Sequence, residues 1–233
     1  MANDRKRCDP VLRTPSDGGA TRSREVTSLA RPPVRRRTFA ATQRGTLSGG
    51  GSRRRRWIRR FIASACLLLI AAVIGGLPVY VRPQIDPLRH ADAIFILGGY
   101  GDLRYSFGLE LGMQGWAPKV VVSNPRGKDD PWLTDYCATR YAGFDLKCFS
   151  PDPPTTKGEG RELQRLASQF GWRTVIVVTF RPQISRARFI LEHCFDGDLV
   201  MVASPDHLPA DRWAFEYGYQ TAGYARAVLE PGC

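Results

Sequence analysis

The sequence predicts a doubly wound α/β domain with a mostly parallel, five-stranded, Rossmann-like sheet, preceded by one transmembrane helix and a disordered basic tail. Three observations lead to this prediction. Short apolar runs alternate with longer amphipathic segments over residues 92–233. An uncharged run of 21 residues covers positions 61–81. Residues 1–60 carry 17 Lys and Arg against 4 Asp and Glu, whereas residues 82–233 carry 17 against 18.

The basic region, residues 1–60, is expected to be a disordered cytoplasmic tail. Its first 52 residues are mostly Arg, Ser, Thr, Gly and Pro with few aliphatic side chains. Such a composition buries too little apolar surface to offset the entropy lost on ordering. No nucleic-acid recognition motif accompanies the charge, so we expect no nucleic-acid partner. Contact with anionic lipid headgroups is the favoured alternative to a nucleic-acid arm.

The apolar run, residues 61–81, is expected to be a transmembrane helix that uses the lipid bilayer as its partner. As a helix it would be about 31 Å long, enough for a hydrocarbon core of about 30 Å. Arginines directly before the run favour a cytoplasmic N-terminus. They are Arg53, Arg54, Arg55, Arg56, Arg59 and Arg60. The prediction is therefore a single-pass protein of the plasma membrane with an extracytoplasmic C-terminal domain.

Two alternatives to an anchor remain for this run, a cleaved signal peptide and a buried core helix. The long region before the run and the lack of a clear A-x-A cleavage pattern after it favour the anchor over the signal peptide. Residues 82–91 are interpreted as a linker between the helix and the α/β domain. The domain itself is expected to cover residues 92–233.

Four cysteines fall in the outer domain, an even number that suits an oxidising compartment. Four cysteines allow three pairings. Cys137 with Cys148 is expected, because it needs only the second helix to lie beside the third strand. Cys194 with Cys233 would then join the C-terminal end to the helix after the fourth strand. Four free thiols in a cytosolic domain are the alternative, and the scattered histidines predict no metal site.

The domain is expected to contain five strands and five helices in alternation. The predicted strands are residues 93–97, 119–123, 147–150, 174–179 and 199–203. The predicted helices are residues 102–115, 130–142, 157–170, 182–194 and 209–229. Continuous β-branched runs suit strands buried on both faces. With a strand order of 3-2-1-4-5, a ligand site is expected beyond the carboxyl ends of the first and fourth strands.

A glycine-rich loop follows the first strand and is the first half of the candidate site. It contains Gly98, Gly99, Gly101 and Asp102, and Arg104 lies in the first turn of the next helix. Glycines let the backbone approach a ligand, and helix amides together with a guanidinium favour an anion. A glycine-rich turn with a surface arginine is the structural alternative. The loop lacks the last glycine of the dinucleotide-binding fingerprint.

The second half of the candidate site comes from two later helix starts. Thr156 and Glu159 open the helix before the fourth strand, and their spacing is also that of a simple capping box. Gln183 and Arg186 follow the fourth strand and are one helical turn apart, so they should share a face. Ligand binding and helix capping both remain open for the first pair.

These motifs resemble the YdcF-like family, the group that includes SanA and ElyC. The resemblance rests on three motifs: strand-GG-x-G-D-x-R, a central T-x-G-E before a helix, and V-V-T separated by six residues from R-A-R. It covers about residues 91–233. It implies an α/β domain, often tethered by one N-terminal membrane helix, and a role in the integrity and barrier function of the cell envelope.

This chain departs from the family pattern at one position. Gln183 stands where the family usually has a histidine, and glutamine cannot transfer a proton near neutral pH. The first hypothesis is therefore an enzyme that acts on an anionic or phosphorylated envelope precursor. In it Arg104 and Arg186 hold the anion, and Asp102 or Glu159 handles a proton or a metal. The second is a non-catalytic sensor or scaffold that uses the same cleft for a small anionic ligand or an envelope protein. No particular cofactor is indicated.

Overall fold

The computed structural model describes residues 50–233, so most of the predicted disordered tail lies outside the described residues. The described part begins with helix α1, Gly50–Gly76, which continues into a π-helical segment, η1, Leu77–Val81. The tail prediction is wrong for residues 50–60, which are helical. Arginine is a good helix former, so the basic cluster extends the apolar helix instead of ending it. Residues Ser52–Val81 are long and apolar enough to cross a membrane.

The five strands form one sheet in which every neighbouring pair is parallel. They are β1 Ala93–Ile96, β2 Lys119–Ser123, β3 Asp145–Phe149, β4 Thr174–Thr179 and β5 Asp198–Ala203. Their order is β3-β2-β1-β4-β5, which confirms the predicted order. In the register of the central strand, Phe95 lies between Val121 of β2 and Val177 of β4. The predicted third strand began two residues too late, because this edge strand is only partly buried and its apolar run is weak.

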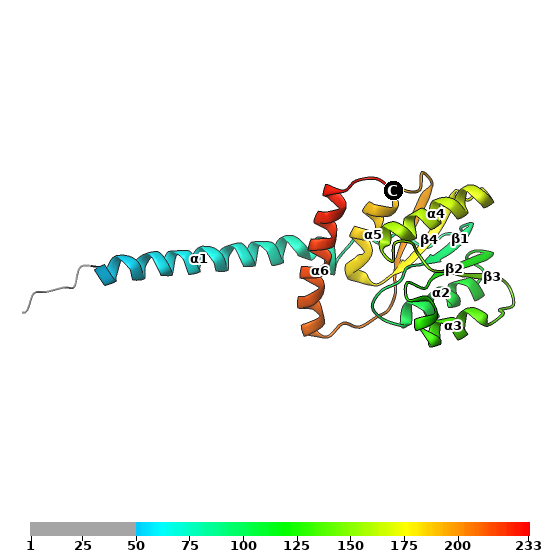
Figure 1. The fold of residues 1–233 in the computed structure, drawn as a ribbon, viewed down its shortest axis with the longest axis horizontal. Coiled ribbons are helices and arrows are strands. Elements are labelled where there is room, and N and C mark those ends of the chain that lie inside the picture. The colour runs from blue at the N-terminus through cyan, green and yellow to red at the C-terminus, as the bar shows by residue number, and fades with distance from the viewer. Residues whose placement is uncertain (1–49) are drawn as a thin grey trace, which may run out of the picture. The chain divides into compact units, whose positions relative to one another are not determined.

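Helices cover both faces of the sheet (Figure 1). They are α2 Leu103–Met113, α3 Pro131–Ala138, α4 Thr156–Phe170, α5 Ile184–Leu191 and α6 Ala210–Leu229, with 3-10 turns at Gly127–Asp129 and Arg181–Gln183. Residues of α2 and α3 pack in one core cluster with Ile94 and Ile96, and residues of α4 and α5 pack in the other with Phe95 and Leu97. Alternate residues of β1 thus face opposite layers, which is why the run is apolar throughout.

Helices α3 and α5 are each five residues shorter than predicted. Helix α3 ends at Ala138 rather than residue 142, because Thr139 has an extended backbone with ψ of 138°. Helix α5 begins after a 3-10 turn that contains Pro182 and ends at Leu191 rather than residue 194. In both cases the middle of the helix is predicted correctly, but its first and last residues are not.

The predicted linker, residues 82–91, contains no helix or strand and is hydrogen-bonded to the domain. The Asp86 amide donates to the Met201 carbonyl over 3.0 Å, and the Asp86 carboxylate accepts from the Met201 amide over 2.8 Å. Arg188 of α5 donates to the same carboxylate over 2.6 Å. Further along, the Ala91 amide donates to Trp116. The segment therefore fixes the end of η1 beside β5 and α5.

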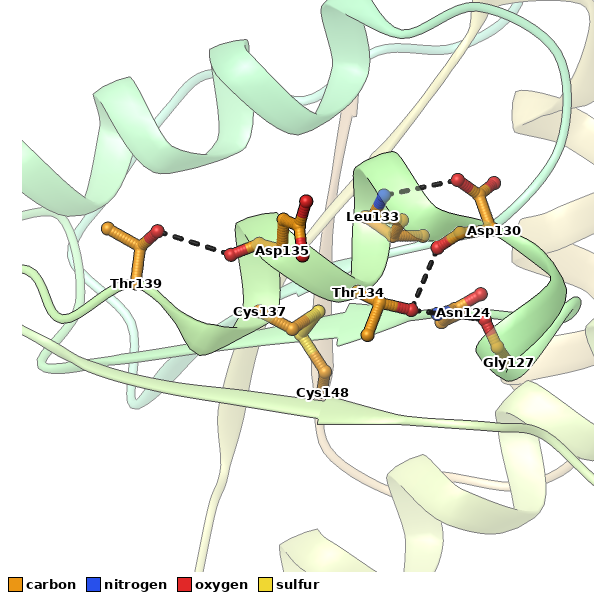
Figure 2. The surroundings of a disulfide bond; sticks show 9 residues. All are labelled: Asn124, Gly127, Asp130, Leu133, Thr134, Asp135, Cys137, Thr139 and Cys148. Carbon is orange, nitrogen blue, oxygen red and sulfur yellow. Dashed lines mark hydrogen bonds between the residues drawn. A yellow bond between two sulfur atoms is a disulfide. The ribbon is translucent and has the colours of Figure 1, made fainter.

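Both predicted disulfides are confirmed. Cys137 of α3 bonds Cys148 of β3, and Cys194, just after α5, bonds Cys233. Figure 2 shows the first bond holding α3 against the edge strand. In the same view the Asp130 carboxylate caps α3 by accepting from the Leu133 amide over 3.1 Å. The second bond attaches the chain end that follows α6 to the α5 layer.

Candidate active site

A cavity of about 930 Å³ lies beyond the carboxyl ends of β1 and β4. Its walls come from the loops after these two strands, the start of α4 and the inner side of α6. This is the place where a parallel sheet with this strand order offers a ligand crevice. The volume is within the range of small-molecule sites, about 300–1,000 Å³.

The glycine-rich loop after β1 forms one wall of the cavity. Gly99 and Gly101 have φ values of +134° and +89°, a region that favours glycine. A Cβ at Gly99 would lie 3.0 Å from an Arg104 nitrogen and 3.3 Å from the Gln183 side-chain oxygen. The loop is therefore packed between these two side chains and has no room for another residue type. Asp102, at the cavity rim, is exposed and makes no capping hydrogen bond to α2.

Arg104 supports this loop from behind and does not line the cavity, which corrects its predicted role as a direct anion ligand. It is fully buried, and its Nε donates to the Gly101 carbonyl over 2.9 Å while Nη1 donates to Leu97 over 3.3 Å. Its guanidinium carbon lies 5.0 Å from the centre of the Phe180 ring. Burial lowers the pKa of Arg104. The cation is turned toward the loop carbonyls, where Nε and Nη1 position the glycines, while Nη2 is buried without a hydrogen-bond partner.

Glu159 is a buried carboxylic acid in the cavity wall. It is 3% exposed, and one carboxylate oxygen accepts the Gly98 amide over 2.6 Å. Burial raises the pKa of Glu159; the Ser123 hydroxyl, the Gly98 amide and then two arginines oppose this rise. The capping-box interpretation is wrong, because Thr155 is the N-cap and accepts from Gly158 over 3.3 Å. The Glu159 side chain reaches across to β1 instead of back to its own helix.

Thr156, Gln183 and Arg186 meet at one hydroxyl group. The Thr156 hydroxyl accepts from Gln183 Nε2 over 3.3 Å and from Arg186 Nη1 over 3.5 Å. The Gln183 oxygen in turn accepts from Thr179 at the end of β4 over 2.9 Å. Gln183 and Arg186 therefore do share a face, as their spacing predicted. The structure brings Gly98, Glu159 and this trio together around the cavity.

Arg186 is the buried cation of the cavity wall. It is 9% exposed, and burial lowers its pKa. Its Nε donates over 2.7 Å to Gln220 of α6, whose own amide nitrogen donates over 2.7 Å to Glu216. Within the described residues Arg186 takes part in none of the ion pairs, whereas Glu216 pairs with Arg212. A buried guanidinium with neutral partners is a favourable site for an anion.

Aromatic rings make up much of the remaining wall. They are Tyr100, Tyr105, Phe180, Phe189, Phe215 and Tyr219. Arg212 lies 4.1 Å from the centre of the Tyr100 ring, and Arg186 lies 5.8 Å from that of Tyr219. Such a cavity suits a ligand with one anionic group and an apolar body. Among residues 50–233, no three His, Cys, Asp or Glu side chains form a metal-binding group.

The contribution of α6 was missed by the sequence analysis. Its inner side carries Arg212, Glu216 and Gln220, each four residues after the last, so the three form a stripe on one face. Glu216 and Gln220 are the buried residues of this helix. A polar stripe is usually a solvated face, so this one was not recognised as part of the site. The i, i+4, i+8 spacing of unlike polar groups between aromatics was the available signal.

The fold and the site thus define a parallel α/β domain with a partly aromatic cavity, a buried arginine and a buried carboxylic acid. Comparisons of the chain with protein-family models, curated proteins and solved structures find no match.

Proposed function

We propose that this chain is a membrane-anchored cell-envelope protein of the YdcF-like type, with a Rossmann-like extracytoplasmic domain that binds a small anionic or phosphorylated ligand. The observation that carries the proposal is Arg186, a buried cation with no carboxylate partner on the wall of a ligand-sized cavity. A phosphate monoester with an apolar body matches both the guanidinium and the aromatic walls.

Turnover of the ligand would use Glu159. A buried carboxylic acid with a raised pKa holds its proton at a higher pH than usual and can donate it to a leaving group. Thr156 and Gln183 would orient the anion beside it by hydrogen bonds. Asp102 stays a candidate for a second proton-transfer group at the rim.

A direct test uses the full chain in nanodiscs and titration calorimetry with hexyl phosphate. Arg186→Lys replaces a planar fork by a point charge and should weaken binding by about 1–3 kcal/mol, or roughly 5- to 150-fold. Arg165→Lys is the control, because Arg165 is an exposed arginine paired with Glu162 on α4. Equal affinity in the wild type and the Arg186 variant would contradict the proposed site. Inorganic phosphate is titrated in parallel. The difference between its affinity and that of hexyl phosphate measures the contribution of the apolar body.

A second candidate function, a non-catalytic sensor or scaffold, is favoured by Gln183. Its side chain already has a hydrogen-bond donor in Thr179 and an acceptor in Thr156, and it does not titrate near neutral pH. Phosphate release from hexyl phosphate separates the two functions. If the wild type releases phosphate and Glu159→Gln abolishes this release, the enzyme function is supported. If only the Gln183→His variant releases phosphate, the wild type is non-catalytic.

The proposed orientation places the N-terminus in the cytoplasm and the α/β domain outside. The charge difference between residues 1–60 and 82–233 supports it. Alkaline phosphatase fused after Cys233 should be active in cells, since this enzyme requires an oxidising compartment for its own disulfides. Fluorescence from a reporter that folds only in the cytoplasm, fused at the same position, would reverse the orientation.

A further inference from the structure

The outer face of α6 carries almost no charge. Between Arg212 and Arg226 the helix has a single charged residue, Glu216, and this side chain is buried. The exposed positions of that stretch that do not line the cavity are Ala214, Gly218, Thr221 and Ala225. A helix face in contact with water normally carries charged residues. Small, uncharged residues in their place indicate a different environment.

Helix α6 also contacts the end of the apolar helix. The Tyr217 hydroxyl donates to the Val73 carbonyl over 3.4 Å, and the Tyr217 ring packs edge-on against Tyr80 with centres 5.1 Å apart. The Tyr80 hydroxyl lies 2.9 Å from that of Thr221. A second hollow, of about 590 Å³, lies between η1 and α6 and has no charged residue in its walls. Figure 1 shows α6 at the domain end of α1, and these contacts make the outer face of α6 adjoin the apolar helix.

The length of α1 determines how near the domain must come to a bilayer. Arg60 is the last charged residue before the apolar run, and from Phe61 to the end of α1 at Gly76 the helix rises about 24 Å. The hydrocarbon core is about 30 Å thick. Contacts with the domain already begin at Val73. The apolar run crosses the core only with η1 included, and these contacts begin about 18 Å along the helix from Phe61, so the domain surface around Val73 must reach the headgroup region.

We propose that the outer face of α6 rests in the interfacial layer of the same bilayer that α1 spans. This inference rests on the proposed membrane anchoring. Tyr and Trp side chains favour the membrane–water interface, and this helix contributes Trp213, Tyr217 and Tyr224, which lie outside the cavity wall. Because its inner side forms a wall of the cavity, the cavity opens beside the lipid headgroups. An amphiphilic anion could then reach Arg186 from the bilayer surface without passing through water.

Spin labels on the full chain in nanodiscs test this contact. Single cysteines at Ala214 and Gly218 are introduced separately in a background with Cys8 and Cys66 replaced by serine. Both sites are exposed, and a side chain at Gly218 would meet no atom within 4 Å. Ser168→Cys, at an exposed position of α4, is the matched control for a helix in water. A chain that keeps Cys66, an exposed thiol of α1, reports on the anchor itself.

The measured quantity is the ratio of collision rates with oxygen and with a nickel chelate, since oxygen concentrates in the bilayer and the chelate in water. We expect ratios several-fold higher at positions 214 and 218 than at 168, and the highest ratio at Cys66. The inference is overturned if the ratio is high at Cys66 but the ratios at 214 and 218 equal that at 168. The anchor would then remain supported. A ratio at Cys66 equal to that at 168 overturns the anchoring, and the inference falls with it.

Discussion

The Gly98 amide donates a hydrogen bond of 2.6 Å to the carboxylate of Glu159, which joins the end of β1 to the first turns of α4. The two residues are 61 positions apart in the chain. The bond connects the two halves of the candidate site, which are the glycine loop and the group formed by Thr156, Gln183 and Arg186. It also stabilises the charged form of Glu159, whereas burial favours the neutral form. Burial has the larger effect, so the site holds a carboxylic acid with a raised pKa.

Glu159→Gln should change how stability depends on pH. The pKa of Glu159 is raised in the folded chain, so its contribution to stability is complete below its unfolded pKa near 4.5 and is lost as pH rises through the folded pKa. Glutamine does not titrate and keeps an oxygen for the Gly98 amide. The midpoint of thermal unfolding, measured from pH 4 to pH 8, should therefore fall more steeply with pH in the wild type than in the variant. Parallel curves would mean that Glu159 has an ordinary pKa.

Gly223→Ala should weaken anion binding, whereas Gly218→Ala on the same helix should not. A Cβ at Gly223 would lie 3.0 Å from Arg186 Cδ and 3.2 Å from its Nε, so the guanidinium must move away from Gln220. Gly218 has nothing within 4 Å. Both changes raise helix propensity by about 1 kcal/mol, which makes them a matched pair. We expect hexyl phosphate to bind Gly223→Ala about 5-fold or more weakly, a loss of about 1 kcal/mol, with Gly218→Ala unchanged.

The sheet order and the disulfides could be predicted because they depend on strong local patterns. β-branched runs such as Thr174–Thr179 have few alternatives to a buried strand, and the parallel order then fixes which loops meet. Cys137 and Cys148 belong to neighbouring elements, so their pairing needed no long-range information. Helical spacing, which is also a local pattern, placed Gln183 and Arg186 on one face.

The rest of the site depends on which way side chains point and on which helix faces other elements cover. A pattern in the sequence shows neither. Whether Arg104 points into the cavity or back to the Gly101 carbonyl is decided by the turn of a single side chain. Glu216 and Gln220 resemble a solvated stripe until the helix is packed over the cavity. Asp86 stands alone in a segment without periodicity, so nothing in the sequence indicated that it is docked on Met201.

The two disulfides should contribute unequally to stability. In the chain-entropy model the stabilisation grows with the length of the closed loop, and the separations are 11 residues for Cys137–Cys148 and 39 for Cys194–Cys233. These correspond to about 3 and about 4 kcal/mol. Replacing both cysteines of each pair by serine should lower the thermal midpoint more for the second pair. The second variant should also lose affinity for hexyl phosphate, because that bond fixes the end of the chain that follows the cavity-lining helix α6. A larger effect on stability from the first pair would show that local packing outweighs loop length.

Asp86→Ala tests whether the segment before β1 is a docked part of the domain. The Asp86 carboxylate accepts from the Met201 amide and from Arg188, and its side chain is only 16% exposed. Removing an acceptor that serves a partly buried amide and a cation should cost about 1–3 kcal/mol, or roughly 3–10 °C in the thermal midpoint of a domain of this size. Asp198→Ala is the control: its ion pair with Arg89 is 3.5 Å long and 72% exposed on the aspartate side, so the loss should stay below about 1 kcal/mol. If the two variants unfold at the same temperature, the Asp86 contacts do not fasten the segment to the domain.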